Sequence, residues 1–166
     1  MAYTPAIGVQ PANLVAKQIG YDPDRAQDGG FLINVQALAN GYGLQWAFLA
    51  TPGKRTDASA TAAAAVSPLD QLTATPGAFG LVMWAHLFSL GSGTPTIKIQ
   101  ESSDNAGDAY TDVAGATWTP SGAQTAARIA TGSINVERYL KVVTTGTFTS
   151  AVLAVSVYRH RIATVY

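Results

Sequence analysis

The sequence predicts an all-β protein: an antiparallel β-sandwich, jelly-roll-like, with an extended N-terminal arm. Two observations lead to this prediction. Apolar and polar residues alternate with a period of two in several segments, and short turns rich in Gly, Ser, Asp and Thr separate these segments. Such alternation is typical of strands that bury one face, and turns at this spacing favour a jelly roll or a related sandwich.

Residues 1–30 are predicted to form the arm, because they contain three prolines, four glycines and no sustained apolar period. An arm of this kind either wraps a neighbouring subunit and becomes ordered on assembly, or it is a frayed terminus. The sequence leaves both interpretations open.

Residues 31–166 are predicted to form the sandwich domain. Its first element is expected to be a hairpin, in which residues 31–38 alternate as a strand with one well-buried face and residues 42–50 return along it. The dipeptide Asn40-Gly41 supplies the positive φ values of the tight turn between them.

A loop is expected over about residues 51–76, with one helical turn in the alanine-rich part, residues 58–66. Residues 54–57 are interpreted as a solvated turn. The next strand, residues 79–88, is apolar on both faces, which indicates a place in the middle of a sheet or under an interface between subunits. Further strands are predicted at residues 96–102, 110–113, a short segment ending at Trp118, 128–130, 137–144 and 151–160.

The composition favours a protein that functions in an assembly over an enzyme. Hydrophobic residues make up 48% of the chain and charged residues only 12%, and ten acidic side chains balance ten basic ones. With no net charge there is no long-range field to attract nucleic acid or an anionic membrane, so neither partner is expected. A sparsely charged surface gives weak protection against self-association and predicts a homo-oligomer or larger assembly.

The chain lacks cysteine, which excludes thiol nucleophiles, disulfides and thiolate metal sites. No secretory signal is visible, and the longest apolar stretch, residues 79–90, is too short to span a bilayer. The protein is therefore expected to be made in the cytoplasm.

Catalytic residues are not predicted. The two histidines, His86 and His160, have no nucleophile elbow near them in sequence. His86 is expected to be packed inside the protein and His160 to be the polar end of the last strand. The protein is thus predicted not to be an enzyme.

Cofactor and metal sites are not predicted either. The clustered oxygen ligands Asp104, Asn105, Asp108 and Asp112 do not match a calcium loop, and they are expected to build a turn. No argument brings the carboxylates of Glu101, Asp104 and Glu137 together for glycoside cleavage, and Glu137 is expected to pair with its neighbour Arg138.

Aromatic side chains offer a third possibility, a platform for sugar rings. Most are expected to lie in the core, with at most one or two reaching solvent. The candidates are Trp46, Trp84, Trp118, Tyr42, Tyr110, Tyr139 and Tyr158.

Five segments, taken in their order along the chain, resemble a β-sandwich module of structural proteins of tailed bacteriophages. They are residues 39–46 (ANGYGLQW), 53–57 (GKRTD), 97–105 (IKIQESSDN), 110–113 (YTDV) and 137–148 (ERYLKVVTTGTF). The resemblance covers residues 28–166, is most specific in the second half, and leaves the first arm unmatched.

This resemblance implies a non-enzymatic virion protein present in many copies and assembled in the host bacterial cytoplasm. The favoured function is that of a capsid decoration or cement protein, whose partners are the phage major capsid protein and copies of itself. One alternative is a tail-tube or tail-associated structural protein. A second, which the aromatic residues raise, is a glycan-binding module for host adhesion.

Overall fold

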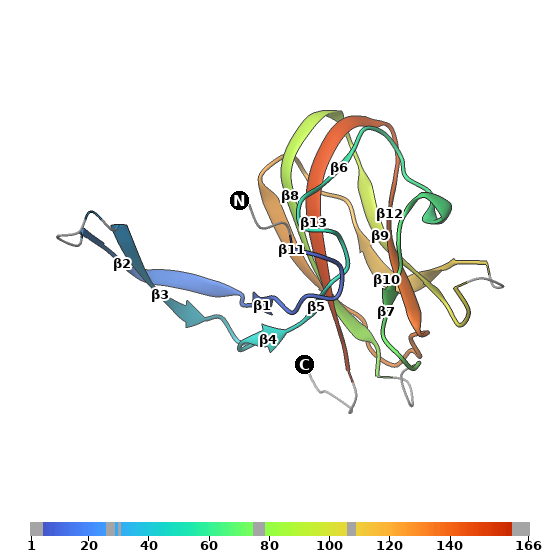
Figure 1. The fold of residues 1–166 in the computed structure, drawn as a ribbon, viewed down its shortest axis with the longest axis horizontal. Helices are drawn as coiled ribbons and strands as arrows, with labels where there is room; N and C mark the ends of the chain where they lie inside the picture. The colour runs from blue at the N-terminus through green and yellow to red at the C-terminus, as the bar shows by residue number, and fades with distance from the viewer. Residues whose placement is uncertain (1–4, 26–28, 30, 75–78, 106–108, 161–166) are drawn as a thin grey trace. The chain divides into compact units, whose positions relative to one another are not determined.

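A computed structural model of the chain describes residues 5–25, 29, 31–74, 79–105 and 109–160, with only the backbone for residues 32 and 33 (Figure 1). In these residues the fold is all-β, and the strands pair antiparallel in every sheet. The one helical element among them is a 3-10 turn, η1 (Ala63–Ala65), at the place where one helical turn is predicted. No helix in this part of the chain has the length and apolar character needed to cross a membrane.

The strands, in chain order, are β1 (Ala12–Asn13), β2 (Ala16–Arg25), β3 (Phe31–Ala39), β4 (Gln45–Trp46), β5 (Phe48–Leu49), β6 (Arg55–Asp57), β7 (Leu69–Asp70), β8 (Leu81–Gly93), β9 (Thr96–Ser102), β10 (Thr111–Trp118), β11 (Thr125–Ala130), β12 (Tyr139–Thr145) and β13 (Phe148–Arg159). They belong to two compact units. The larger unit consists of Met1–Pro11 and Ala47–Tyr166, and the smaller unit of Ala12–Trp46. These bounds differ from the predicted division at residue 30.

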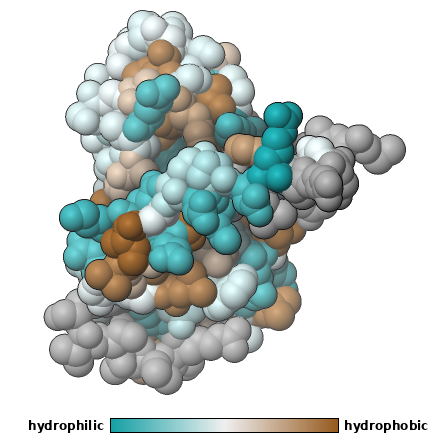
Figure 2. All heavy atoms as spheres, turned by 90° about the vertical axis from the view of Figure 1, so that its left-hand side faces the viewer, coloured by the Kyte–Doolittle hydropathy of each residue, from teal (hydrophilic) through white to brown (hydrophobic). Residues whose placement is uncertain are grey.

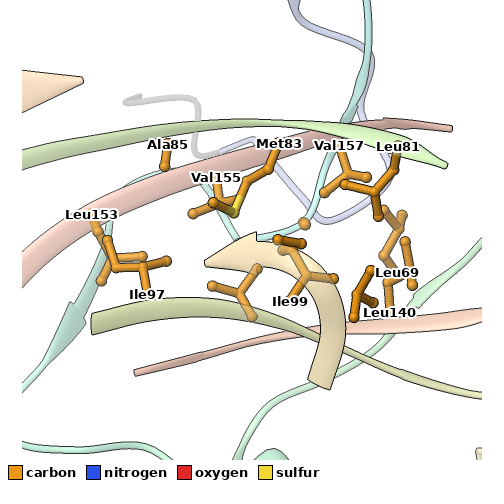
Figure 3. Close-up of a cluster of buried hydrophobic side chains, with 14 of the residues drawn as sticks. Leu69, Leu81, Met83, Ala85, Ile97, Ile99, Leu140, Leu153, Val155 and Val157 are labelled. Carbon is orange, nitrogen blue, oxygen red and sulfur yellow. The ribbon is translucent and has the colours of Figure 1, made fainter. Parts of the chain in front are cut away.

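Two sheets face each other in the larger unit. One has the strand order β10-β9-β12-β7, and the other has the order β11-β8-β13-β5, with β6 also paired to β13. Apolar side chains from both sheets point toward one another and form the core (Figure 3). The labelled core residues are Leu69, Leu81, Met83, Ala85, Ile97, Ile99, Leu140, Leu153, Val155 and Val157.

Strand β8 lies in the middle of its sheet, between β11 and β13, as its two apolar faces predict. Leu81, Met83, Ala85 and Leu87 project into the core from one face. On the other face Val82 and Trp84 are also buried. Central placement explains why this strand lacks the simple polar and apolar alternation of its neighbours.

The N-terminal segment is partly integrated into the larger unit. Gly8 N donates a hydrogen bond to Leu49 O at 2.8 Å, and Leu49 N donates to Val9 O at the same distance, so this segment runs beside β5. Residues 16–25 then form strand β2 instead of continuing an extended arm. In these two stretches the predicted extended arm is thus paired, with β5 in the one and with β3 in the other.

The predicted hairpin between residues 31–38 and 42–50 is wrong in its pairing. Strand β3 pairs with β2, from Arg25 opposite Phe31 to Ala16 opposite Ala39. Gly41 does adopt a positive φ of 87°, as the Asn-Gly signal predicts, but the bend leads to β4, which pairs with β1. The smaller unit is thus a long two-stranded ribbon, β2–β3, joined to a short β1–β4 pair.

Candidate interaction surface

The two faces of the β2–β3 ribbon differ, one being richer in apolar residues than the other. Residues paired across an antiparallel ribbon project to the same side, and successive pairs alternate. One side therefore carries Tyr21 opposite Val35 and, nearer the tip, Phe31 opposite Arg25. We call Tyr21, Pro23, Phe31, Val35 and Ala37 the apolar ribbon face; Arg25 and Gln18 lie on the same side at its two ends.

The opposite face of the ribbon is largely hydrophilic. It carries Asp22 opposite Asn34, Asp24, Gly20 opposite Gln36, and Lys17 opposite Leu38, which is exposed. The extra residue Ile19 lies in a bulge where the register shifts between Gln18 and Gly20.

The apolar ribbon face is exposed. Tyr21, Phe31 and Val35 expose 56%, 62% and 57% of their surface. Figure 2 shows brown, apolar side chains open at the surface among teal, hydrophilic ones on the side of the molecule that it draws. Of the twelve exposed large hydrophobic side chains in the described part of the chain, nine belong to the smaller unit: Leu14, Ile19, Tyr21, Phe31, Val35, Leu38, Tyr42, Leu44 and Trp46. Because large exposed apolar areas are uncommon on soluble monomers, this concentration makes the smaller unit the candidate interaction surface.

The larger unit has an apolar groove of about 610 Å³. Residues from the N-terminal segment, from β5, from the loop between β5 and β6 and from β13 line it: Pro5, Val9, Pro11, Leu49, Gly53, Lys54 and Ala154. We call this set the apolar groove. Lys54 is the one charged residue among these lining residues, and its Nζ lies 4.3 Å from the centroid of the Phe88 ring.

Residues 54–57 do not form the predicted solvated turn. Asp57 is buried, and its Oδ2 accepts hydrogen bonds from Arg55 Nη2 and from Thr144 Oγ1, both at 2.8 Å. Arg55 Nη1 also donates to Val142 O at 2.9 Å. Since β6 belongs to one sheet and β12 to the other, the hydrogen bonds of this buried ion pair to Val142 and Thr144 link the two sheets.

Among the described oxygen ligands, Asp112 and Asn105 each bond to another side chain. Asp112 accepts hydrogen bonds from Lys98 Nζ at 2.7 Å and Gln100 Nε2 at 2.8 Å, and both contacts lower its pKa. Asn105 Oδ1 accepts a hydrogen bond from the Tyr110 hydroxyl, and Asp108 lies outside the described residues. Within those residues no group of three His, Cys, Asp or Glu side chains is placed to hold a metal ion.

The carboxylates considered for acid–base chemistry have structural partners. Glu101 Oε2 accepts a hydrogen bond from the backbone N of Glu137 at 2.8 Å, and burial raises the pKa of Glu101. Arg138 pairs with Asp70 at 2.8 Å, which overturns the predicted Glu137–Arg138 pair. The hydrogen bonds from Arg138 and from the backbone N of Leu72 lower the pKa of Asp70 to about 2.

The two histidines lie apart. His86 is exposed and stacks on Phe88, with ring centroids 6.1 Å apart, so the prediction of a packed interior residue is wrong. His160 directly follows β13, as predicted for a strand end, but it is buried, and its ring meets Tyr158 edge-on. The backbone N of His160 donates a hydrogen bond to Gly80 O. Gly80 precedes His86 by six residues of extended chain, which span roughly 20 Å. The two imidazoles are therefore too far apart to belong to one site.

Fewer of the candidate aromatic residues are buried than expected. Trp84 is buried, and Trp118, Tyr110, Tyr139 and Tyr158 are partly buried. Only Tyr42 and Trp46 of the predicted set are exposed, and both belong to the smaller unit. Sequence reasoning missed Tyr21, which lies in the stretch treated as an arm. The signal that could have found it is the apolar alternation of residues 31–37, which requires a partner strand.

The geometry therefore defines an all-β protein with two open apolar surfaces, the ribbon face and the groove. No protein-family model matches the chain, and no curated protein matches it. What these two surfaces can do must follow from their chemistry: both can bury apolar area against protein, and neither presents paired reactive groups.

Proposed function

We propose that the chain is a non-enzymatic structural protein of a tailed-bacteriophage virion, a capsid decoration protein. In this function it binds neighbouring coat subunits and copies of itself. One observation carries the proposal: nine exposed large hydrophobic side chains are concentrated in Ala12–Trp46. A two-stranded ribbon is marginally stable alone in water, so a ribbon with an exposed apolar face needs a protein partner.

We also propose that the sandwich is a jelly roll. Taking β5 and β7 to β13 as eight strands in chain order, the first pairs with the eighth (β5 with β13) and the second with the seventh (β7 with β12). The third pairs with the sixth (β8 with β11) and the fourth with the fifth (β9 with β10). A single long antiparallel hairpin rolled into two facing sheets gives this nested pairing, which supports the jelly-roll topology.

The proposed mechanism is mass-action stabilisation. A protein that binds only the assembled coat shifts the equilibrium toward assembly by its binding free energy at each site. The zero net charge of this chain lets many copies pack densely without mutual repulsion. The segmental resemblance to phage structural proteins supports the virion as the location of this assembly.

The first prediction concerns the ribbon. Val35→Asp places a charge on the apolar ribbon face, and we expect this variant to be retained on particles at a copy number at least severalfold below wild type. Asn34→Asp is the matched control, since it adds the same charge one residue away on the polar face. Copy number per purified particle, measured by quantitative mass spectrometry, checks the prediction.

Equal retention of the Val35→Asp and Asn34→Asp variants would contradict a binding role for the apolar ribbon face. Electron microscopy with a label at the carboxyl terminus locates the protein in the same particles. Labels over the capsid support decoration, whereas labels confined to the tail would replace it with the tail alternative.

A glycan-binding module is the second candidate, and the joint exposure of Tyr42 and Trp46 favours it. Aromatic faces stack on the apolar faces of sugar rings. A glycan array on which wild type binds and Trp46→Ala does not would support adhesion, and an array without signal would dismiss it.

A further inference from the structure

We propose that strand β3 of one copy pairs antiparallel with β3 of a second copy, so that the two ribbons join edge to edge as one four-stranded sheet. This inference deepens the proposed function and rests on it, because it names the contact between copies of the chain. The contact uses the main-chain groups at the open edge of the ribbon and not the apolar ribbon face. Since both copies contribute the same strand, the contact is isologous and closes as a dimer.

The outer edge of β3 is open. Among the described residues β3 pairs with β2 alone, and every side chain of β3 that the structure describes is exposed. Pro23 on β2 indicates which main-chain groups face this edge: proline lacks an N–H, so its nitrogen faces away from the paired strand. Its partner Ile33 is then also in a non-hydrogen-bonded pair, and it directs its N–H and C=O outward. The direction alternates along a strand, so Phe31 and Val35 do the same, and the edge carries a regular row of donors and acceptors.

The two edges of the ribbon differ in their protection against strand addition. β2 interrupts its outer edge with Pro23 and with the bulge at Ile19, and it carries the charged Asp22 and Asp24. The nine residues of β3, FLINVQALA, include no proline, no glycine and no charged side chain. The other edge strands in the described part of the chain either carry a charge (β6, β7, β10 and β11) or are only two residues long (β1, β4 and β5). A long, uncharged edge such as that of β3 is a template for another strand.

The sequence of β3 selects a second copy as the partner, because the strand is complementary to itself. Antiparallel pairing can place Val35 opposite its own counterpart, which makes a β-branched pair at the centre. Phe31 then lies opposite Ala39, so a large side chain meets a small one. Asn34 lies opposite Gln36, so two amides meet, and no charged side chain lies in the contact. In this register the residues whose main-chain groups face outward lie opposite one another, so the ladder between the copies is complete.

A four-stranded sheet also removes the weakness of the single ribbon. A two-stranded ribbon is marginally stable alone, whereas three or more strands with an apolar face can be stable. The twofold axis of this pair is perpendicular to the sheet, so the two apolar ribbon faces lie on the same side. The exposed side chains of Tyr21, Phe31 and Val35 from both copies then form one apolar surface, which is available to coat protein. The contact between the strands is itself held by main-chain hydrogen bonds, as in other cases of strand addition.

Disulfide trapping tests this register directly, because the chain has no cysteine of its own. Asn34→Cys and Gln36→Cys change exposed side chains that lie opposite each other across the proposed contact. Opposite residues in such a non-hydrogen-bonded pair have Cα atoms about 4.5 Å apart, a separation that a disulfide can span. The two purified variants are mixed with a mild oxidant, and non-reducing electrophoresis with mass spectrometry identifies the products. We expect mixed dimers linked between positions 34 and 36, severalfold in excess of either self-linked dimer.

Asp22→Cys is the matched control partner for Gln36→Cys, since it lies on the same side of the ribbon but on β2. Mixed dimers between positions 34 and 36 that are no more frequent than those between positions 22 and 36, or a predominance of self-linked dimers, would overturn the pairing of β3 with β3.

Val35→Pro tests the main-chain contact separately. It removes the outward N–H at the centre of the open edge but no N–H that β2 receives, as Pro23 already does on the other strand. We expect sedimentation analysis to show dimerisation severalfold weaker than that of Val35→Thr, a β-branched control that keeps the N–H. Equal dimerisation of the two variants would contradict the proposal.

Particle retention distinguishes this inference from the proposed function. If the link between positions 34 and 36 is not favoured while Val35→Asp still lowers retention, the dimer is overturned and the proposed function stands. If that link forms while Val35→Asp and Asn34→Asp are retained equally, the dimer stands without the function in the virion.

Discussion

At the scale of single residues, the Arg55–Asp57 pair is the most buried of the three ion pairs found in the described residues. The Asp57 side chain is only 3% exposed and that of Arg55 only 12%. Two further hydrogen bonds complete the cluster. Arg55 Nη1 donates to Val142 O, and Thr144 Oγ1 donates to Asp57 Oδ2. Because removing one member of a buried pair leaves the other charge without compensation, this cluster is sensitive to substitution.

We predict that Asp57→Ala lowers the free energy of unfolding by about 3–5 kcal/mol, through the uncompensated charge of Arg55. Urea unfolding followed by circular dichroism at neutral pH measures this change. Asp112→Ala is the matched control, since Lys98 and Asp112 also pair at 2.7 Å but are 27% and 44% exposed. Solvent and salt screen such a pair, so the control should lose less than about 1 kcal/mol. An equal, small loss in both variants would refute the assigned role of Asp57.

Residue types alone predicted part of this picture. The absence of cysteine and the mismatch to a calcium loop excluded thiol chemistry and that type of metal loop directly from sequence. The burial of Asp57 could not be predicted, because Lys-Arg-Thr-Asp is polar in sequence and its partners on β12 lie more than eighty residues away. Local composition carries no information about such a distant partner.

At the scale of elements, one glycine controls the turn from β8 to β9. Gly93 has a φ of 79°, and a Cβ added there would clash with the backbone of Thr147 and Phe148 at the start of β13. Thr94 N donates a hydrogen bond to Thr147 O at 3.0 Å, which holds the two segments together. The close approach leaves no room for a side chain.

We predict that Gly93→Ala lowers the free energy of unfolding by more than about 2 kcal/mol. The left-handed conformation contributes about 1–2 kcal/mol, and displacement of the neighbouring backbone adds to it. Gly122→Ala, at a glycine with open space around its Cα, should be nearly neutral. Thermal unfolding monitored by circular dichroism compares the two variants. A Gly93→Ala protein as stable as the control would show that the backbone relaxes without cost.

Strands with regular alternation were predicted well, whereas the ribbon was not. Residues 96–102 match β9, and residues 137–144 and 151–160 overlap most of β12 and β13. The segments at 110–113 and ending at Trp118 are one strand, β10, interrupted by a register shift near Gly115, which has a positive φ. In β2, Gly20 and Pro23 interrupt the apolar pattern, so the sequence did not predict this strand. Both strands of a two-stranded ribbon are edges, where a proline without an N–H is tolerated.

At the scale of the whole molecule, the larger unit buries its apolar residues between two sheets, and the smaller unit leaves them exposed. Period-two alternation predicts that one face of a strand is buried. It does not predict whether the same chain or another chain buries that face. Residues 31–37 alternate like a core strand, yet Phe31 and Val35 are exposed in the single chain. The composition of the sequence favours an assembled protein, but only the structure shows where the exposed apolar residues lie.

Hydrogen exchange of the backbone amides tests the central claim most directly, namely that the β2–β3 ribbon is completed by other protein molecules. In the isolated chain at low concentration, amides of Ala16–Arg25 and Phe31–Ala39 should exchange far faster than those of β8 and β13, because a two-stranded ribbon opens easily. In the assembled state the ribbon amides should become protected while β8 and β13 change little. Ribbon amides that are already as protected in the isolated chain as those of the core would contradict the claim.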